Sequence, residues 1–550
     1  MMAETMTNAD NFWLQMDHPT NLMVITGIME FKETLDYDQA CKTLEDRLCA
    51  FDRFRQIAVA PISGVGVASW EFDPYFDIRS HFQRVALPGA GGKAELQRMC
   101  SDLMTIPMDR TKPLWSCHLI ENYKSGCALF FRLHHCIADG ISLVYVLLST
   151  ADTEPGGKPL FGDKFKRKKR KWSPPSFIPA GQLLTSVSGV IDKTQVVGEK
   201  LMAEWSKVMS DPSYMKKFAR NTASLSVDTA TVLGKLAMMP FDPKTSLKGP
   251  LKVRKCVAWT NLISLEKVKK ISKAVDATIN DVLIASVAGA LRQYLMMRGD
   301  RVHDTELRAA IPVNIREPGT AFELGNKFSL VFLALPVYIE DPVLRLREVK
   351  KRMDHLKQSP DAYVAFMVLS ALGLSSASIA TTASHFFGNK ASMVMTNVPG
   401  PRETLYFAGK KIENFIGWVP TSGRVGMGIS IFSYAGKVGI GLVTDEGLVP
   451  DPEAILKYFE DELDYLHDIS KTGNVDVTPL IVGYTGEAAA KSVKSVKKKT
   501  PPEMEKAGAP ADSLEISRIC IAMTKSGSPC KKKPVPGSDY CSMHQPESKR

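Results

Sequence analysis

Apolar residues in the first 150 positions form short blocks that differ in length and spacing. Residues 22–31 (LMVITGIMEF) and 128–133 (ALFFRL) are rich in apolar, β-branched and aromatic side chains, a composition that favours strands. Residues 141–148 (ISLVYVLL) are apolar enough for a core helix or a strand, and the preceding Asp139-Gly140 favours the start of a helix. The pattern therefore predicts a mixed α/β region.

A second α/β region follows after a break in the pattern. The break covers residues 152–175, which contain prolines, glycines and a basic run, and the helical spacing from 176 to about 247 is only weakly ordered. Beyond it, the apolar spacing predicts helices over 264–273 and 278–297, and strands near 307–315, 329–336, 392–397 and 438–444.

These changes in pattern predict five segments. No period of 20–50 residues repeats, which argues against a solenoid or propeller. The segments are an N-terminal α/β lobe, a basic Pro-rich linker with a helical crossover, a second α/β lobe, a disordered spacer and a small C-terminal module, with the bounds 1–151, 152–250, 251–472, 473–515 and 516–550.

One stretch raises the question of a membrane span. Residues 362–389 contain no charged side chain, but Gly373, His385 and seven Ser or Thr residues interrupt their apolar character. A transmembrane helix needs about 20 predominantly apolar residues. We therefore expect a buried helix followed by a loop, with contact to lipid left open.

The net charge of +11 is concentrated in two segments. Residues 164–171 carry seven positive charges, and residues 480–550 hold 13 basic and 7 acidic side chains, so the rest of the chain is close to neutral. Such segments fit anionic surfaces, either membrane headgroups or nucleic acid, and equally fit solvated linkers. The ten scattered cysteines and the absence of an apolar leader predict reduced thiols in the cytosol.

The strongest chemical signal is the segment His134-His135-Cys136-Ile137-Ala138-Asp139-Gly140, between a predicted strand and a predicted helix. Adjacent histidines at a strand end point in different directions, so one can face a cavity while structure holds the other. Asp139 is placed to cap the helix or to pair with a cation, and Gly140 permits close backbone approach or unusual dihedrals. The residue types alone do not decide whether the two histidines are packed in the core or catalytic, and the two possibilities are equally open.

This segment matches the HHxxxDG signature of CoA-dependent acyltransferases, and further motifs make the chain resemble the bacterial-type wax ester synthase/diacylglycerol acyltransferase family. The resemblance covers about residues 8–470, with Met108 and Leu283-Ile284 as mild departures. It is carried by matching segments at 9–14, 19–21, 70–82, 85–88, 107–110, 113–115 (PLW), 280–285 (NDVLIA), 312–316, 324–326 and 397–401 (NVPGP).

The resemblance implies a fold and a reaction. The fold would be α/β, with two similar lobes like those of chloramphenicol acetyltransferase and an active-site tunnel between them. The reaction would transfer a long-chain acyl group from CoA to a fatty alcohol or diacylglycerol, with no cofactor. Acyl-CoA would enter from one side and the acceptor from the other, and the protein would associate peripherally with the inner membrane surface or lipid droplets.

The resemblance and acid–base chemistry together assign roles to the motif. A neutral imidazole has a suitable pKa to take a proton from an alcohol, so His135 is the expected general base, in a direct ternary-complex transfer. His134 would support it, and Asp139 would lock the loop. Cys136 is a weak candidate nucleophile, because residues adjacent in sequence rarely align as nucleophile and base.

The remaining motif residues are expected near the substrates. Asn280 would donate to the oxyanion or hold the acceptor, or would instead cap the helix that starts there. Pro113, Leu114 and Trp115 would line a hydrophobic pocket, or would simply pack in the core. By the same resemblance, the chain's Asp281, Asn326 and Asn397 would contact substrate.

The C-terminal module carries four soft ligands at short spacing: Cys520, Cys530, Cys541 and His544. About 30 residues cannot build an adequate core, so a structural zinc ion is predicted, against the alternative of a tail with incidental cysteines. Its partner is unknown.

Two other functions compete with lipid acyl transfer. One is a condensation-type acyltransferase that uses carrier-bound acyl groups, and the PLW and NVPGP elements argue against it. The other is an inactive acyltransferase-like protein with a nucleic-acid-binding tail, which the intact HHxxxDG motif and Asn280 disfavour.

Overall fold

The N-terminal sheet forms around the two segments predicted as strands. The computed structural model describes residues 4–61, 66–157, 160, 239–315, 324–357, 377–421 and 423–471, all within the compact unit Met1–Val477. The sheet has the order β15 (Asn414–Trp418), β2 (Val24–Phe31), β7 (Gly126–His134), β6 (Trp115–Tyr123) and β5 (Phe82–Ala86). Neighbouring strands are antiparallel, except that β5 and β6 are parallel.

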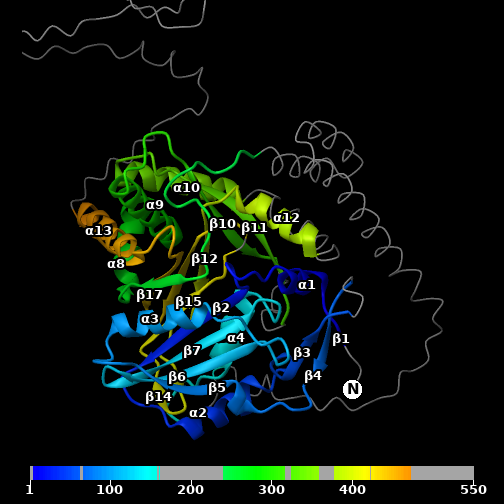
Figure 1. Cartoon of the computed structure of the whole chain (residues 1–550). Coiled ribbons are helices and arrows are strands. Elements are labelled where there is room, and N and C mark those ends of the chain that lie inside the picture. The colour runs from blue at the N-terminus through cyan, green and yellow to red at the C-terminus, as the bar shows by residue number, and fades with distance from the viewer. Residues whose placement is uncertain are drawn as a thin grey trace, which may run out of the picture. The chain divides into compact units, whose positions relative to one another are not determined.

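Short helices and a small sheet surround this N-terminal sheet (Figure 1). The α-helices are α1 (Asn8–Gln15), α2 (Tyr37–Thr43), α3 (Lys93–Met104) and α4 (Gly140–Ser149), and single turns cover Leu44–Leu48, Asp52–Arg55 and Ile78–Ser80. A three-stranded sheet has the order β1 (Glu4–Thr5), β4 (Ser69–Phe72) and β3 (Gln56–Val59).

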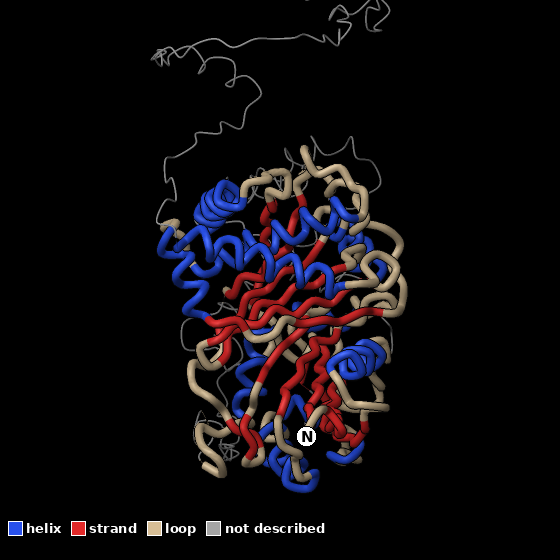
Figure 2. The backbone as a smooth tube through the Cα atoms, turned by 90° about the vertical axis from the view of Figure 1, so that its left-hand side faces the viewer, coloured by secondary structure: helices blue, strands red, loops and turns tan. Residues whose placement is uncertain are grey.

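The C-terminal sheet has more strands than the N-terminal sheet, and a layer of helices covers it (Figures 1 and 2). Its order is β11 (Phe328–Leu335), β10 (Leu307–Asn314), β12 (Met393–Pro399), β16 (Met427–Tyr434), β17 (Lys437–Asp445) and β8 (Lys255–Trp259), with β9 (Ile263–Ser264) also on β17. The helices of this half are α8 (Leu265–Ala274), α9 (Ile279–Met297), α10 (Pro342–Lys357), α12 (Ala377–Gly388) and α13 (Pro452–Lys471). A small hairpin joins β13 (Tyr406–Phe407) and β14 (Lys410–Lys411).

Strand β15 ties the two halves together. It lies in the predicted C-terminal lobe, 251–472, yet it pairs with β2 in the N-terminal sheet. Its side chains are apolar on both faces: Phe415 packs on Phe432, while Ile416 and Trp418 enter a cluster with Phe130 of β7 and Trp259 of β8. Because both faces are buried, this short strand joins the cores of both halves.

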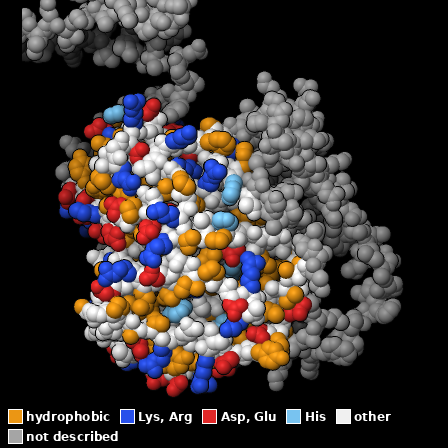
Figure 3. All heavy atoms as spheres, viewed as in Figure 1, with side chains coloured by type: hydrophobic (Ala, Val, Ile, Leu, Met, Phe, Trp, Pro, Cys, Tyr) orange, Lys and Arg blue, Asp and Glu red, His pale blue; other side chains and the backbone are white. Residues whose placement is uncertain are grey.

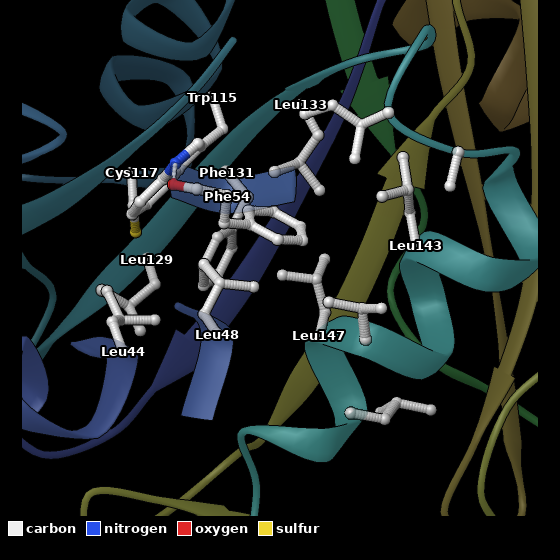
Figure 4. Close-up of a cluster of buried hydrophobic side chains, with 14 of the residues drawn as sticks. Leu44, Leu48, Phe54, Trp115, Cys117, Leu129, Phe131, Leu133, Leu143 and Leu147 are labelled. Carbon is white, nitrogen blue, oxygen red and sulfur yellow. Dashed lines mark hydrogen bonds between the residues drawn. The ribbon is translucent and has the colours of Figure 1, made fainter. Parts of the chain in front are cut away.

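The N-terminal core places the end of β7 against α4 (Figure 4). Phe131 and Leu133 of β7 pack there with Trp115 of β6 and with Leu143 and Leu147 of α4. Each fully buried side chain of this size contributes about 1.5–3 kcal/mol of transfer free energy. The loop between β7 and α4 is therefore held from both ends.

The uncharged stretch 362–389 is only partly described. Its last part forms α12, which ends at Gly388 as a helix, and residues 358–376 lie outside the described residues. Among the helices that the structure describes, no single one is long and apolar enough to cross a bilayer; α8 and α9 meet those criteria only as a pair bent by 94°.

Several predicted segments cannot be compared with the structure. The basic run 164–171 and most of the predicted linker, the spacer 473–515, and the module with Cys520, Cys530, Cys541 and His544 lie outside the described residues. On the face shown in Figure 3, basic and acidic side chains are interspersed, in keeping with a nearly neutral body.

Candidate active site

The HHxxxDG segment forms the connection between β7 and α4. β7 is buried along its whole length and ends at His134, and α4 begins at Gly140. Asp139 caps the helix as predicted, because its Oδ1 accepts a hydrogen bond of 3.0 Å from the Ser142 amide. The strand and the cap together fix both ends of the loop.

His135 lies on the wall of a cavity between the two halves. The cavity encloses about 790 Å³, counting the part open to solvent, and its lining includes Trp13, Ile141, Phe328, Leu330 and Val398. We call it the reaction cavity. The imidazole stacks on the Trp13 indole, with ring centroids 4.4 Å apart, and the Phe328 ring lies 5.4 Å away. Aromatic faces therefore hold the imidazole at the cavity wall.

The surroundings of His135 favour its neutral form. Burial lowers the pKa of His135 to about 4, and the nearby His134 ring acts in the same direction, while its own carbonyl, Asp139 and Asn326 oppose it. Nδ1 is buried and has no hydrogen-bond partner among the described residues. Nε2 is thus the ring nitrogen that remains for a reactant in the cavity.

His134 is held by the protein on the other side of the strand end. Its Nδ1 accepts a hydrogen bond of 3.2 Å from the Cys136 amide, and its Nε2 lies 3.7 Å from Asp17 Oδ2. Burial alone would raise the pKa of the Asp17 carboxyl, but His134, the Met23 amide and Arg110 together lower it. The two histidines thus have the different environments that their adjacent positions on a strand end predict.

Residues 325–327, just before β11, hold this loop through hydrogen bonds. The Asp139 amide donates to the Gly325 carbonyl, and Asp139 Oδ2 accepts from the Lys327 amide at 3.1 Å. Asn326 Nδ2 donates to the His135 carbonyl at 2.7 Å and to Asp10 Oδ1 at 2.8 Å. Asn326 does not line the reaction cavity and its Nδ2 group holds the backbone of His135, so its expected contact with substrate stays a prediction.

Gly140 has a simpler role than predicted. It does not have a positive φ, and a Cβ at this position would meet no atom within 4 Å. Gly140 lines the reaction cavity. The missing side chain therefore leaves space beside His135, and no unusual dihedral is involved.

Asn280 and Asn397 come together at the reaction cavity. Asn397 lines the cavity, and its Nδ2 donates to Asn280 Oδ1 at 2.6 Å. The alternative that Asn280 caps α9 is wrong, because Thr278 is the cap and Asp281 completes a capping box with it. Asp281 is fully buried in that box, which corrects its expected substrate contact.

The PLW element packs in the core rather than around substrate. Pro113, Leu114 and Trp115 are buried and are not among the residues that line the reaction cavity. Trp115 Nε1 donates to the Phe54 carbonyl at 2.8 Å, and its indole stacks on His81. The Leu114 carbonyl accepts from the His134 amide at 2.9 Å. The element thus packs in the core beside the end of β7, which is the core-packing alternative stated for it above.

Trp13, Phe328 and Asp10 belong to the site although the sequence analysis gave them no role. Trp13 and Asp10 lie on α1, and Phe328 lies on β11, far from the HHxxxDG segment in the sequence. Burial raises the pKa of the Asp10 carboxyl, against the hydrogen bonds that it accepts from Asn326. Asp10 and Trp13 lie in the motif segment 9–14, but the motif gives them no role, because only the tertiary fold brings them and Phe328 to His135.

The described residues offer neither a thiol nucleophile nor a metal site. Cys136 is buried, and burial raises the pKa of its thiol well above the ordinary value, so it stays protonated. No group of three His, Cys, Asp or Glu side chains in the described ranges is arranged to hold a metal ion. The predicted zinc ligands lie outside those ranges, so that zinc site stays a prediction.

Known proteins match the chain along most of its length. An O-acyltransferase WSD of Acinetobacter baylyi is 26% identical over 72% of this chain and 82% of its own length. A protein of Mycobacterium tuberculosis named as a diacylglycerol O-acyltransferase is 25% identical over 85% of this chain and 91% of its own. The fold matches a wax ester synthase/diacylglycerol acyltransferase from Marinobacter aquaeolei with a TM-score of 0.61 at 21% identity, covering 85% of this chain and 100% of that one.

The family models place these likenesses on the two halves. Residues 6–283 match the wax ester synthase/diacylglycerol acyltransferase catalytic domain, which contains the HHxxxDG loop, and residues 324–467 match the C-terminal domain of the same family. The motifs identified in the sequence lie inside these two matches, apart from residues 284–285 and the segment 312–316, which lie between them. The chain belongs to the wax ester synthase/diacylglycerol acyltransferase family.

Proposed function

We propose that the protein transfers an acyl group from acyl-CoA to the hydroxyl of a fatty alcohol or a diacylglycerol. The observation that carries this proposal is a buried His135, stacked on Trp13 at the wall of a largely apolar cavity. A general base must be unprotonated at the working pH and within reach of the hydroxyl. The family membership and the names of the relatives agree with this chemistry.

The mechanism needs only one base and no covalent enzyme intermediate. Nε2 of His135 takes the hydroxyl proton while the alcohol oxygen attacks the thioester carbon. The tetrahedral intermediate then collapses, the carbon–sulfur bond breaks, and the protonated imidazole returns the proton to the CoA thiolate. The low pKa of His135 makes its protonated form a better proton donor for this return and the neutral ring a correspondingly weaker base in the first step.

The Asn280–Asn397 pair is the candidate stabiliser of the intermediate. The hydrogen bond from Asn397 to Asn280 Oδ1 fixes the orientation of the Asn280 amide and leaves the Asn280 Nδ2 group as a donor. A donor near the reaction cavity can serve a developing oxyanion or hold the acceptor hydroxyl. Both assignments remain within the role that the sequence predicted for Asn280.

The experiment that tests the proposal measures CoA-thiol release from palmitoyl-CoA. The purified full-length chain is assayed with hexadecanol, with dioleoylglycerol and without acceptor, and the ester product is identified by mass. We expect release that depends on the acceptor, and the ratio of the two rates assigns the preferred alcohol. Acceptor-independent release, or none from folded protein, would reject acyl transfer to these alcohols.

The pKa of His135 predicts the acid side of the pH profile. The active form of the base is neutral, and a pKa lowered from 6.5 to about 4 keeps it neutral well below pH 6.5. We expect kcat/KM to stay flat from pH 8 to about pH 5.5 and to fall as the pH approaches about 4.

The same pKa also affects stability, which must be checked. The unfolded chain takes up a proton on this histidine below about pH 6.5, so its contribution to stability is lost as the pH falls from there through about 4. Each assay is therefore paired with a circular dichroism spectrum and with recovery of activity at pH 7. A reversible acid limb near pH 6.5 in folded protein would contradict the pKa of His135.

Peripheral binding to lipid surfaces is a second part of the proposal. Residues 164–171 carry seven positive charges, each able to contribute about 1 kcal/mol near an anionic leaflet. Replacing these seven with glutamine should release the protein from vesicles containing phosphatidylserine and spare the turnover of a soluble short-chain alcohol. Unchanged sedimentation with those vesicles would exclude this run as the anchor.

A further inference from the structure

A second pocket lies next to the reaction cavity and shares a wall with it. This side pocket encloses about 510 Å³, counting the part open to solvent. Its lining comes from residues 19–22, from Val24 and Thr26 of β2, from the end of α3 and from β17. Val419 and Pro420 line both the side pocket and the reaction cavity. The two spaces therefore adjoin at Val419 and Pro420.

A row of buried polar side chains crosses the N-terminal sheet beside the side pocket. Directly opposite positions on neighbouring strands place Ser116, Arg132, Thr26 and Trp418 side by side. Opposite residues share a face of the sheet, and two residues of this face, Val24 and Thr26, line the side pocket. The other three polar residues lie behind Thr26 on the same face and do not line the pocket themselves. We call these four residues the polar row.

The polar row is short of acceptors. Within the described residues, Ser116 Oγ, Arg132 Nε, Thr26 Oγ1 and Trp418 Nε1 are all buried without a hydrogen-bond partner. Indole and guanidinium groups only donate, and both hydroxyls are able to donate. Buried polar groups are normally paired, so a set of four unpaired donors on one sheet face indicates a missing acceptor.

Arg132 adds an uncompensated charge to these donors. Its side chain is only 4% exposed, and its contact through Nη2 is to a neutral acceptor, the Ile106 carbonyl. No carboxylate in the described part of the chain pairs with it. Lys255, which also lines the side pocket, is by contrast neutralised by Asp445 at 2.6 Å. A buried charge without a counter-ion costs stability, and a bound anion offsets that cost.

We propose that the polar row binds a phosphate of the CoA moiety, so that acyl-CoA enters through the side pocket and the acceptor through the reaction cavity. This inference rests on the proposed function, in which the thioester donor is the only charged substrate. Fatty alcohols and diacylglycerols are neutral and give a buried guanidinium nothing to pair with. The largely apolar reaction cavity, which contains His135, suits their chains.

The geometry along β7 is consistent with this assignment. Arg132 lies three residues before His135, which corresponds to about 10 Å along a strand. The Arg132 guanidinium reaches further, to Ile106 just after α3. Residues three apart on a strand face opposite sides of the sheet, so a ligand with its anionic part at the polar row and its thioester near His135 must pass from the side pocket into the reaction cavity, which adjoin at Val419 and Pro420.

The test is a thermodynamic cycle that compares two ligands, with and without phosphate, on two forms of the protein, with and without the Arg132 side chain. Binding of CoA and of pantetheine, which lacks every phosphate, is measured by calorimetry for the wild type and for Arg132→Met. We expect Arg132→Met to weaken CoA binding about 10- to 100-fold, the range of a lost hydrogen bond to a charged group, and to change pantetheine binding less than about two-fold. Equal losses for both ligands, or no loss for either, would overturn the proposal.

Two further variants separate ligand binding from structural damage. Arg84→Met removes the same charge from β5, where Arg84 is exposed and paired with Glu121, and should leave CoA binding unchanged. Arg132→Met should melt at the same or a higher temperature without ligand, because it removes an unpaired buried charge. A lower melting temperature with unchanged CoA affinity would make Arg132 structural. If Arg132→Met does not fold, Arg132→Lys replaces it in the cycle.

Failure of this inference is distinguishable from failure of the proposed function. CoA binding needs no turnover, so a phosphate-dependent effect of Arg132 in a chain without transferase activity would reject only the proposed reaction. Normal acyl transfer, combined with CoA binding that does not depend on Arg132, would reject only the role of the polar row.

Discussion

Replacing His135 with glutamine is expected to lower kcat for acyl transfer by about 10²–10⁴-fold, the usual contribution of a positioned general base. Glutamine keeps much of the volume between Trp13 and Phe328, so the aromatic stacking site is not left empty. The amide cannot accept a proton at neutral pH, which removes the proposed step. The measurement is acceptor-dependent CoA-thiol release from palmitoyl-CoA under saturating substrate.

Two controls make the result specific to the base. His303→Gln changes an exposed histidine of the C-terminal half and should leave kcat within about two-fold. Cys136→Ala should also retain turnover, because the buried thiol takes no part in the mechanism. If His135→Gln were as active as the wild type, or if Cys136→Ala were inactive while still folded, the assignment of His135 as the base would be wrong.

Replacing Asp139 with alanine is expected to lower the free energy of unfolding by about 2–6 kcal/mol. The carboxylate accepts from the amides of Ser142 and Lys327, and each buried amide left unpaired costs about 1–3 kcal/mol. The change also breaks a link between the HHxxxDG loop and β11, so turnover should fall together with stability. Urea unfolding followed by circular dichroism gives the energy.

Asp36 provides a matched control for this change. It also caps a helix, α2, by accepting from the Gln39 amide at 2.8 Å, but this hydrogen bond is exposed. Asp36→Ala should cost only about 0.5–2 kcal/mol, the usual loss of an exposed cap. An Asp139→Ala protein as stable as Asp36→Ala, yet without turnover, would point to a chemical role for Asp139 instead.

The outcome for the site motifs shows where sequence reasoning was sufficient. The strand before His134 and the helix after Asp139 were predictable, because burial pattern and capping act within a few residues of the chain. The capping box of α9 used the same local chemistry, but Thr278 formed the cap instead of Asn280. Neighbouring residues with similar capping ability are difficult to distinguish without the backbone dihedrals.

Motif membership did not reveal what each motif residue contacts. The motif left Trp115 and Leu114 open between a pocket and the core, and they are in the core; Asn326, expected at substrate, holds the His135 carbonyl. Only Asn397 among the expected substrate contacts lines the reaction cavity as described. A motif identifies residues that the fold or the reaction needs. The burial and the hydrogen bonds of each residue then show whether it packs in the core or lines a ligand site.

The sequence by itself determined the family, the two α/β regions and the histidine pair that carries the proposed chemistry. These follow from periodicity, capping and motif order, all of which are local properties of the chain. The tertiary structure alone decided that β15 completes the N-terminal sheet, that Trp13 and Asn326 hold His135, and that Arg132 has no counter-ion among the described residues. Such features depend on contacts between distant segments. The energetic effect of a charged side chain can be judged only when its buried neighbours are known.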